Sequence, residues 1–216
     1  MSAQEAEQKP KEPTIDSENT IATTRWLALK TLSYTDREGV QRKWDIATRT
    51  SHTGQGQPDA VVIIPVLKSS KSKTLETILV SQFRPPMAQR TIEFPAGLVD
   101  EGERPEETAV RELLEETGYV GTVYEEFQSM LLCMTPGLTN ETIKIIALNV
   151  DLDDSRNKNP KQMLDDGEDI SLIRVPLLDG LRSAIDDKEN GMPIAMLYTF
   201  AMGLEIGLKH GKNSTA

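Results

Sequence analysis

The chain has 216 residues, of which 38% are hydrophobic and 27% charged, a composition typical of a globular protein with room for one substantial domain. The formal net charge of −10 excludes a general binder of nucleic-acid backbones, and no apolar run approaches the roughly 20 residues of a membrane span. The only cysteine, Cys133, cannot form an intrachain disulfide, and the polar N-terminus is typical of neither a secretion signal nor a transit peptide. We therefore expect an intracellular protein of the cytoplasm, with the nucleus left open.

The first part of the chain predicts a tail and a hairpin. Residues 1–20 are rich in Glu, Gln, Lys, Pro and Ser, and we expect them to be disordered because little of this segment could be buried. Two segments with strand character follow at 25–34 and 40–49, and the turn residues between them predict a β-hairpin. Gly, Gln and Pro at 54–58 indicate a linker, so that 21–58 forms an N-terminal hairpin element.

The rest of the chain predicts one α/β domain over 59–210 and a flexible tail at 211–216. Pro105 suits the first turn of a helix, and Gly118 is placed as its C-terminal cap. Strands are expected at 60–67, 75–83, 91–94, 122–133, 142–150 and 170–175, an acidic loop at 151–169, and further helices at 177–188 and 194–209. Together these elements predict a mixed sheet between helices, an α/β/α sandwich.

A cluster of carboxylates marks residues 97–119, which read GLVDEGERPEETAVRELLEETGY. Glu112, Glu115 and Glu116 stand at positions i, i+3 and i+4, so all three project from one helix face. Like charges at that spacing weaken a helix by about 0.2–0.5 kcal/mol per pair, and a bound cation would offset this cost. With no His or Cys nearby, the oxygens suit Mg²⁺, with Mn²⁺ as a substitute, better than zinc. An amphipathic helix with a solvated charged face is the alternative interpretation.

The same segment resembles the Nudix box, the signature of hydrolases that cleave nucleoside diphosphates linked to another moiety. Gly97, Glu103 and the run RELLEETG at 111–118 fill every fixed position at the expected spacing. Tyr119 stands where the pattern usually has an aliphatic residue, and we expect a change in packing with no consequence for chemistry. The resemblance implies a Nudix-type α/β/α sandwich with a mixed sheet, here preceded by the N-terminal β-hairpin element.

The resemblance also implies a role for each polar residue of the box. Diphosphate hydrolysis uses divalent ions to neutralise phosphoryl charge and to activate a water molecule. The implied metal ligands are the backbone carbonyl of Ala96 and the carboxylates of Glu112, Glu115 and Glu116. Arg111 orients one of these glutamates and is counted, with Glu115, among the catalytic residues. Glu103 and Glu93 are expected as partners of the metal ligands or as ligands of an extra ion.

Outside the box the chain resembles the ADP-ribose pyrophosphatase branch of the family, including the eukaryotic ADP-sugar hydrolases. This resemblance runs from about Trp26 to Glu168. Its strongest segments are QFRPP at 82–86, IEFPAG at 92–97, PGLTNE at 136–141 and DGE at 166–168. In this branch a proline beyond the box is associated with ADP-ribose preference, and Pro136 lies 17 residues after Tyr119.

Substrate contacts are implied for Trp26, Trp44, Arg49, Arg84, Leu98 and Thr135. The two tryptophans would stack on adenine, one from each subunit of a dimer, with about 1–3 kcal/mol per stack. Packing of the hairpin onto the body is the alternative role for both rings. Arg49 and Arg84 would contact the diphosphate or the ribose, because guanidinium groups suit forked hydrogen bonding, or would be surface charges. Thr135 stands where some relatives carry an acidic residue, so contacts at the sugar end stay open.

Glu168, at the end of the acidic loop, is the implied general base, carried on a loop that closes over substrate. A solvated loop carboxylate is the alternative. We assign no role to Cys133, which lies in an apolar strand segment and is expected in the core, or to His52 and His210, which have no companions at ligand spacing.

These features predict Mg²⁺-dependent hydrolysis of ADP-ribose to AMP and ribose 5-phosphate by a homodimer with exchanged N-terminal hairpins. Another ADP-sugar or an oxidised nucleoside diphosphate is the enzymatic alternative. A non-catalytic Nudix-like module that binds a nucleotide is the alternative from another class, although such modules typically lose box glutamates and this chain keeps them. Neither a nucleic acid nor a membrane is expected as a partner.

Overall fold

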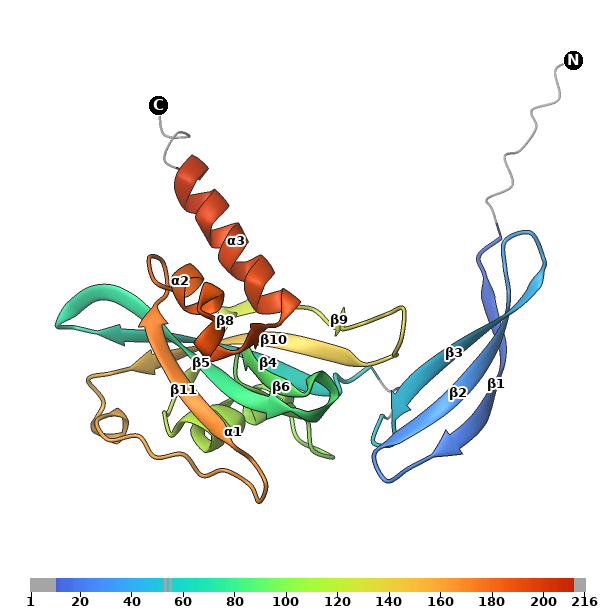
Figure 1. Ribbon diagram of the computed structural model, residues 1–216, viewed down its shortest axis with the longest axis horizontal. Coiled ribbons are helices and arrows are strands. Elements are labelled where there is room, and N and C mark those ends of the chain that lie inside the picture. The colour runs from blue at the N-terminus through green and yellow to red at the C-terminus, as the bar shows by residue number, and fades with distance from the viewer. Residues whose placement is uncertain (1–10, 53, 55, 212–216) are drawn as a thin grey trace, which may run out of the picture. The chain divides into compact units, whose positions relative to one another are not determined.

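The structure is a computed structural model that describes residues 11–52, 54 and 56–211 (Figure 1). Residues 1–10 and 212–216 of the predicted tails, and positions 53 and 55 at the predicted linker, lie outside the described residues. The chain divides into two compact units. We call Met1–Asp59 with Cys133–Thr142 the N-terminal unit, and Ala60–Leu132 with Ile143–Ala216 the main unit.

An antiparallel sheet forms the core of the N-terminal unit, with the strand order β1 (Thr14–Thr23), β2 (Leu27–Thr35) and β3 (Gln41–Arg49). The predicted turn between β2 and β3 is closed by Asp36, whose carboxylate accepts the backbone N–H groups of Glu38 and Val40 at 3.0 and 2.9 Å. Gly39 adopts a φ of 80°, which glycine reaches without strain. The hairpin expected from the sequence is therefore present as β2 and β3.

Strand β1 corrects the expectation of disorder for residues 14–20 of the predicted tail. Every residue of β1 is exposed, so burial does not explain why it forms. The strand pairs along β2 instead, and Lys30 donates to Glu18 at 3.0 Å while Thr35 donates to Asp16 at 2.8 Å. The composition correctly excluded a buried segment, but a strand also forms where a neighbouring strand satisfies its backbone groups. The N-terminal element is thus a three-stranded sheet and not a hairpin alone.

Residues 133–142 belong to the N-terminal unit, whereas we expected them in the domain at 59–210. Cys133 at the start of this segment is exposed, which corrects the expectation that it lies in the core. The backbone N–H of Ala47 on β3 donates to the carbonyl of Leu138 at 3.0 Å. Arg49 at the end of β3 pairs with Glu141 at 2.6 Å. Such pairing joins segments about 90 residues apart, and local sequence patterns carry no information about it.

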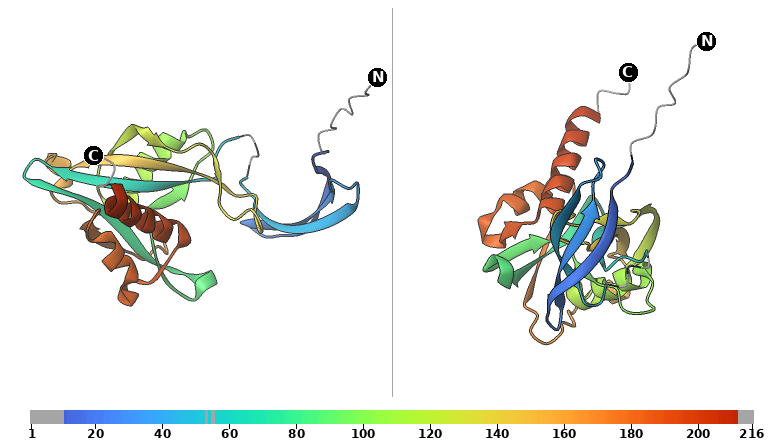
Figure 2. Two further views of the ribbon diagram at one scale, coloured as in Figure 1. Left: turned by 90° about the horizontal axis from the view of Figure 1, so that it is seen from above. Right: turned by 90° about the vertical axis from the view of Figure 1, so that its right-hand side faces the viewer.

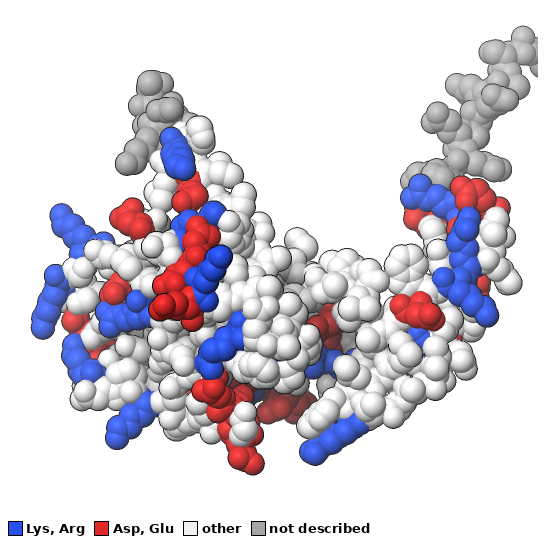
Figure 3. Space-filling view, viewed as in Figure 1, with Lys and Arg blue, Asp and Glu red and all other residues white. Residues whose placement is uncertain are grey.

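The main unit contains a mixed sheet. Its strands are β4 (Ala60–Ser69), β5 (Ser72–Arg84), β6 (Gln89–Glu93), β7 (Ala96–Leu98), β8 (Thr122–Gln128), β9 (Leu132–Cys133), β10 (Thr142–Asp151), β11 (Ile170–Pro176) and β12 (Met192–Pro193). The central order is β12-β6-β5-β4-β10-β8, with β11 paired to β5, β7 to β4 and β9 to β10. Strands β4 and β10 run parallel, whereas β4 and β5 run antiparallel. Acidic and basic side chains are interspersed on the face of this unit that Figure 3 shows.

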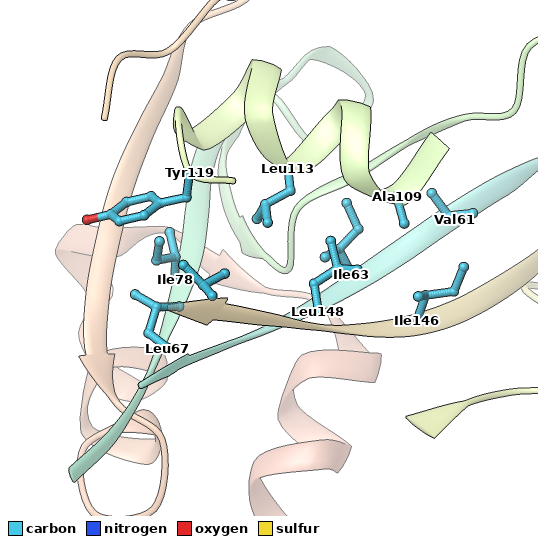
Figure 4. Packing of buried hydrophobic residues seen from close by; sticks show 10 residues of the cluster. Val61, Ile63, Leu67, Ile78, Ala109, Leu113, Tyr119, Ile146 and Leu148 are labelled. Carbon is cyan, nitrogen blue, oxygen red and sulfur yellow. The ribbon is translucent and has the colours of Figure 1, made fainter. Parts of the chain in front are cut away.

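Helices cover both faces of this sheet, which confirms the predicted α/β/α layers (Figure 2). They are α1 (Pro105–Thr117), α2 (Leu181–Asp186) and α3 (Ala195–His210), with short 3-10 turns at Pro85–Met87, Ser155–Asn157 and Lys188–Asn190. On one face Ala109 and Leu113 of α1 pack on Val61 of β4 (Figure 4). On the other face Val62 packs in a cluster with Leu197 of α3. Successive residues of β4 therefore serve opposite layers, as the period of a strand requires.

The ends of the helices follow the predicted residues with one exception. Pro105 begins α1, and Gly118 caps it with a φ of 73° and an N–H that donates to Leu114. Tyr119 lies in the same core cluster, so its bulk is accommodated by packing. The predicted helix at 177–188 shortens to α2 because the N–H of Leu177 still donates to the carbonyl of Leu75 in β5. Among the described residues, none of the helices combines the length and the apolarity that a membrane span requires.

Candidate active site

Arg111 on α1 joins the carboxylates that the sequence places together. Its guanidinium donates to both oxygens of Glu103 at 3.0 and 2.9 Å, to Glu112 at 2.7 Å and to Glu115 at 3.0 Å. It also donates to the carbonyl of Leu98 at 3.3 Å, which ties the helix to β7. The hydrogen bonds from Arg111 are the main reason why the pKa of Glu103 falls to about 2. Arg111 therefore fixes the orientation of three acidic side chains at once.

Gly97 on β7 lets the helix carboxylates approach the strand. A Cβ atom at this position would lie 1.9 Å from the Cδ atom of Glu112, well inside van der Waals contact. The backbone N–H of the preceding residue, Ala96, donates to Glu116 at 3.1 Å. A side chain at position 97 would therefore have to displace the Glu112 carboxylate.

The carboxylates of Glu112 and Glu116 lie in an environment that disfavours their charge. Burial is the main reason why the pKa of Glu116, whose residue is only 4% exposed, rises to about 8. Burial also raises the pKa of Glu112, and the negative charges of Glu115 and Glu168 add to this rise while Arg111 opposes it. A cation near these oxygens would stabilise both ionised groups.

The donor set fits Mg²⁺ in its chemistry, although the ligands are not preassembled. In the part of the chain that the structure describes, no three His, Cys, Asp or Glu side chains form a group that could hold a metal ion. Arg111 occupies oxygens of Glu112 and Glu115, so a cation would compete with it for them. Oxygen ligands and poorly compensated buried carboxylates are nevertheless what a hard divalent cation prefers.

Arg84 lies at the end of β5 in a fixed orientation. Its Nε and Nη2 atoms both donate to Glu93 at 2.8 Å, and Thr91 donates to the same carboxylate at 2.5 Å. Burial opposes the ionised form of Glu93, but the hydrogen bonds from Arg84 and Thr91 outweigh it and lower the pKa of Glu93. The Nη1 atom of Arg84 is not used in this pair, so the guanidinium keeps donors for an anionic ligand.

Glu168 lies within electrostatic range of this cluster. Its charge contributes to the raised pKa values of Glu112, Glu116 and Arg84. Within its own loop the Glu168 carboxylate accepts the backbone N–H of Asp165 at 2.9 Å. The negative charge of Glu168 therefore acts on the helix glutamates, and its role as a general base stays a prediction.

The structure brings most of the expected site residues into the main unit. These are Arg84, Glu93, Ala96, Leu98, Glu103, Arg111, Glu112, Glu115, Glu116 and Glu168. The other four, Trp26, Trp44, Arg49 and Thr135, belong to the N-terminal unit. In that unit the two tryptophans are 65% and 48% exposed, and Arg25 lies 4.3 Å above the ring of Trp26. Thr135 is exposed, and its carbonyl accepts from Leu138 and Thr139 at 2.9 Å.

Three polar residues of the site were not anticipated from the sequence. Thr91 donates to Glu93, and Thr108 donates to Glu103 at 2.7 Å. Gln162 donates from its side-chain amide to the carbonyl of Glu116 at 2.7 Å. Thr91 and Glu93 are two residues apart on β6 and therefore lie on the same face of the strand, so strand periodicity could have pointed to Thr91. Gln162 is 46 residues from its partner, and no local pattern signals that contact.

Comparison with known proteins agrees with this arrangement. Residues 56–191 match a family model described as the NUDIX domain. The chain is 39% identical over 206 residues to an uncharacterized Nudix hydrolase of Schizosaccharomyces pombe, covering 94% of this chain and 97% of that protein. It is 37% identical over 201 residues to an ADP-sugar pyrophosphatase of Mus musculus, covering 92% and 90%. The crystal structure of an ADP compounds hydrolase superposes with a TM-score of 0.63 at 20% identity over 95% and 98% of the two chains, and this likeness shows the fold alone.

Proposed function

The chain belongs to the Nudix family, and from this premise we propose that it hydrolyses ADP-ribose to AMP and ribose 5-phosphate with Mg²⁺, for which Mn²⁺ can substitute. The observation that carries the proposal is the carboxylate cluster around Arg111, in which Glu112 packs against Gly97. A group of buried and half-buried carboxylates fits a cation that binds a diphosphate. The alternative of a solvated charged helix does not account for Glu116, which is 4% exposed.

Different residues of the main unit are assigned to metal binding and to the orientation of the metal ligands. Bound Mg²⁺ would neutralise phosphoryl charge and lower the pKa of a bound water. The residues that would hold it are Ala96, through its carbonyl, and Glu112, Glu115 and Glu116. Arg111 orients the carboxylates of Glu112 and Glu115, and Glu103 and Glu93 fix the two arginines of the site.

Glu168 is the group proposed to take the proton of the attacking water. A carboxylate general base contributes about 10²–10⁴-fold when it lies within hydrogen-bond reach of that proton. Water attacks a phosphorus of the diphosphate directly, and no covalent intermediate with the enzyme is expected. Arg84 contacts the diphosphate through its remaining donors, and Leu98, which is 42% exposed at the end of β7, contacts the substrate.

Adenine recognition is assigned to Trp26 and Trp44, one from each chain of a homodimer. Trp26 precedes Leu27, which pairs with Arg49, while Trp44 pairs with Leu32. Continuing this register places Trp26 opposite position 50, six residues from Trp44, or about 20 Å at 3.4 Å per residue. Two rings stacked on opposite faces of one base lie only about 7–8 Å apart. This spacing supports a sandwich that takes one ring from each subunit, with the N-terminal sheets exchanged.

Three alternatives to ADP-ribose hydrolysis are tested together with it. Another ADP-sugar is favoured as a substrate by the similarity to the mouse ADP-sugar pyrophosphatase. Oxidised nucleoside diphosphates would also present a flat purine to the tryptophans. A non-catalytic module is the alternative from another class, and the complete set of box glutamates argues against it.

The test is turnover of a substrate panel by the purified protein, with Mg²⁺ and with excess EDTA. We expect ADP-ribose to give the highest kcat/KM, and EDTA to abolish release of phosphate-containing products. A higher value for another ADP-sugar or for an oxidised nucleoside diphosphate would assign the protein to that substrate. Tight nucleotide binding without turnover of any substrate would support the non-catalytic module.

A further inference from the structure

Arg90 on β6 reaches across β5 to the start of β11. In the sheet Arg90 pairs with Phe83 of β5, and Ser81 of β5 pairs with Ser171 of β11. The guanidinium donates to the side chain of Ser81 at 3.2 Å and to its carbonyl at 2.5 Å. It is therefore anchored on the middle strand before it contacts the third.

The remaining donors of Arg90 hold the residue that follows Glu168. Nη1 donates to the carboxylate of Asp169 at 2.7 Å, and Nη2 donates to the carbonyl of Asp169 at 3.2 Å. Nη2 also lies 3.2 Å from the hydroxyl of Ser171. Arg90 thus contacts both the side chain and the backbone at the point where the loop enters β11, one peptide unit from Glu168.

The other end of this loop is fixed on helix α1. The backbone N–H of Met163 donates to the carbonyl of Glu115 at 2.8 Å. The Gln162 side chain donates to the carbonyl of Glu116 at 2.7 Å and to the carbonyl of Ile170 at 3.0 Å. These bonds satisfy carbonyls in the last turn of α1, which have no partner within the helix. Figure 1 shows the segment before β11 running past α1.

Only residues 164–168 lie between the two anchored ends. Within them the N–H of Glu168 donates to the carbonyl of Asp165 at 3.1 Å, and Gly167 has a φ of 89° that favours glycine. The turn is short and internally bonded, so its placement depends on the two anchors. A shift at Asp169 would be transmitted to Glu168 through a single peptide unit.

We propose that Arg90 is a positioning residue that holds the Glu168 carboxylate where it can take the proton of the attacking water. The proposal rests on the proposed function of Glu168 as general base. Displacement of a catalytic group by 1 Å can cost on the order of 10²-fold in rate, so an anchor one residue away affects kcat without touching the substrate.

The experiment compares Arg90→Gln with a matched control on the same pair of strands. Arg174 also joins β11 to β5, through an ion pair with Glu76 at 3.1 Å, but at the opposite end of β11 from Glu168. For Arg90→Gln we expect kcat for ADP-ribose to fall at least about 10-fold while KM stays near the wild-type value. Arg174→Gln should leave kcat unchanged. Asp169→Asn, which alters a side chain that is 76% exposed and cannot disturb the core, should lower kcat by about two- to fivefold.

A double variant with Glu168→Gln distinguishes the positioning of Glu168 from a general loss of structure. In Glu168→Gln, whose kcat should fall by on the order of 10²–10⁴-fold, adding Arg90→Gln should cause no further loss. The proposal would be overturned if Arg90→Gln lowered kcat in the Glu168→Gln background by the same factor as in the wild type. It would also be overturned if Arg174→Gln lowered kcat as much as Arg90→Gln does. A normal kcat for both Arg90→Gln and Asp169→Asn, with Glu168→Gln impaired, would also overturn it and leave the base assignment intact. A normal kcat for Glu168→Gln would instead overturn the base assignment in the proposed function, and the role of Arg90 with it.

Discussion

The two units of the molecule differ in where their functional side chains find partners. In the main unit Arg111 donates to Glu103, Glu112 and Glu115, so the box residues bond to one another. In the N-terminal unit Trp26 and Trp44 expose 65% and 48% of their surface. The chemistry is thus assembled within one unit, whereas the proposed stacking surfaces stay open to a ligand or a second chain.

The apolar surface of the N-terminal unit extends beyond the tryptophans. On β2, Leu27 and Leu29 are 47% and 44% exposed, and on β1 Ile15 is 64% exposed. Leu27 and Leu29 lie on one face of β2, whereas Ile15 pairs with Tyr34 at the opposite end of the strand. We therefore expect substitutions of the site residues in the main unit to lower kcat. Substitutions of the exposed residues in the N-terminal unit should raise KM or disrupt a dimer.

The largest effect is expected for Glu116→Gln. The substitution removes a proposed metal oxygen, and metal ions contribute several kcal/mol of charge stabilisation, so kcat should fall by about 100-fold or more. Without metal the variant should be at least as stable as the wild type, because a neutral amide replaces a carboxylate whose buried charge is disfavoured. Turnover with Mg²⁺ and thermal denaturation in EDTA are the measurements. Near-normal turnover would reject the metal site.

Gly97→Ala tests the same site through its backbone. The new Cβ must displace Glu112, whose Cδ atom would lie 1.9 Å away, so kcat should fall by roughly 10–100-fold while the fold is kept. Gly203→Ala is the control, because a Cβ at that helical position meets nothing within 4 Å. The control should stabilise the protein by about 0.5–1 kcal/mol and leave turnover unchanged. Equal turnover of both variants would contradict the role of Gly97.

Trp26→Ala and Trp44→Ala should each raise KM for ADP-ribose. Loss of one stack at about 1–3 kcal/mol corresponds to roughly 5- to 150-fold weaker binding if all of it appears in ground-state affinity. Steady-state kinetics with saturating Mg²⁺ would give KM and kcat separately. An unchanged KM in both variants would place the adenine elsewhere and leave the tryptophans as packing residues.

A mixture of two variants tests whether one active site combines Trp26 of one chain with Glu116 of the other chain. An equimolar mixture of Trp26→Ala and Glu116→Gln should regain up to about a quarter of the wild-type activity, since half of random dimers are mixed and one of their two sites escapes both substitutions. Recovery requires that Trp26 acts in trans to Glu116. No recovery, together with a fully active monomer in sedimentation at micromolar concentration, would exclude the shared site.

The smallest expected effect is on thermal stability. Saturating Mg²⁺ should raise the Tm of the wild type by about 5–10 °C at 100 times its Kd, because a ligand that binds only the folded state stabilises it. Glu116→Gln should lose most of this increase. An equal increase in both proteins would mean that the stabilising ion binds elsewhere.

Local spacing predicted the parts of the fold and the site that depend on nearby residues. The i, i+3 and i+4 positions of Glu112, Glu115 and Glu116 and the capping residues Pro105 and Gly118 lie within one helix, so the sequence specified their arrangement. The layers of the sheet followed from apolar periodicity in the same way.

Contacts between distant segments could not be predicted. Strand β1 forms through pairing with β2 although its side chains are exposed, so hydrophobic patterning gave no sign of it. The bond from Arg90 to Asp169 spans 79 residues and that from Gln162 to Glu116 spans 46. Both depend on sheet register and on the path of the acidic loop, which neither composition nor spacing encodes.

The most direct test of the account is identification of the products formed from ADP-ribose and Mg²⁺ in ¹⁸O-labelled water. Mass spectrometry of the wild-type reaction should show AMP and ribose 5-phosphate in equal amounts, with one ¹⁸O atom in one of the two products. Glu116→Gln should form both at least about 100-fold more slowly. Intact ADP-ribose after prolonged incubation, or products other than this pair, would contradict the central claim that this carboxylate cluster hydrolyses the diphosphate bond.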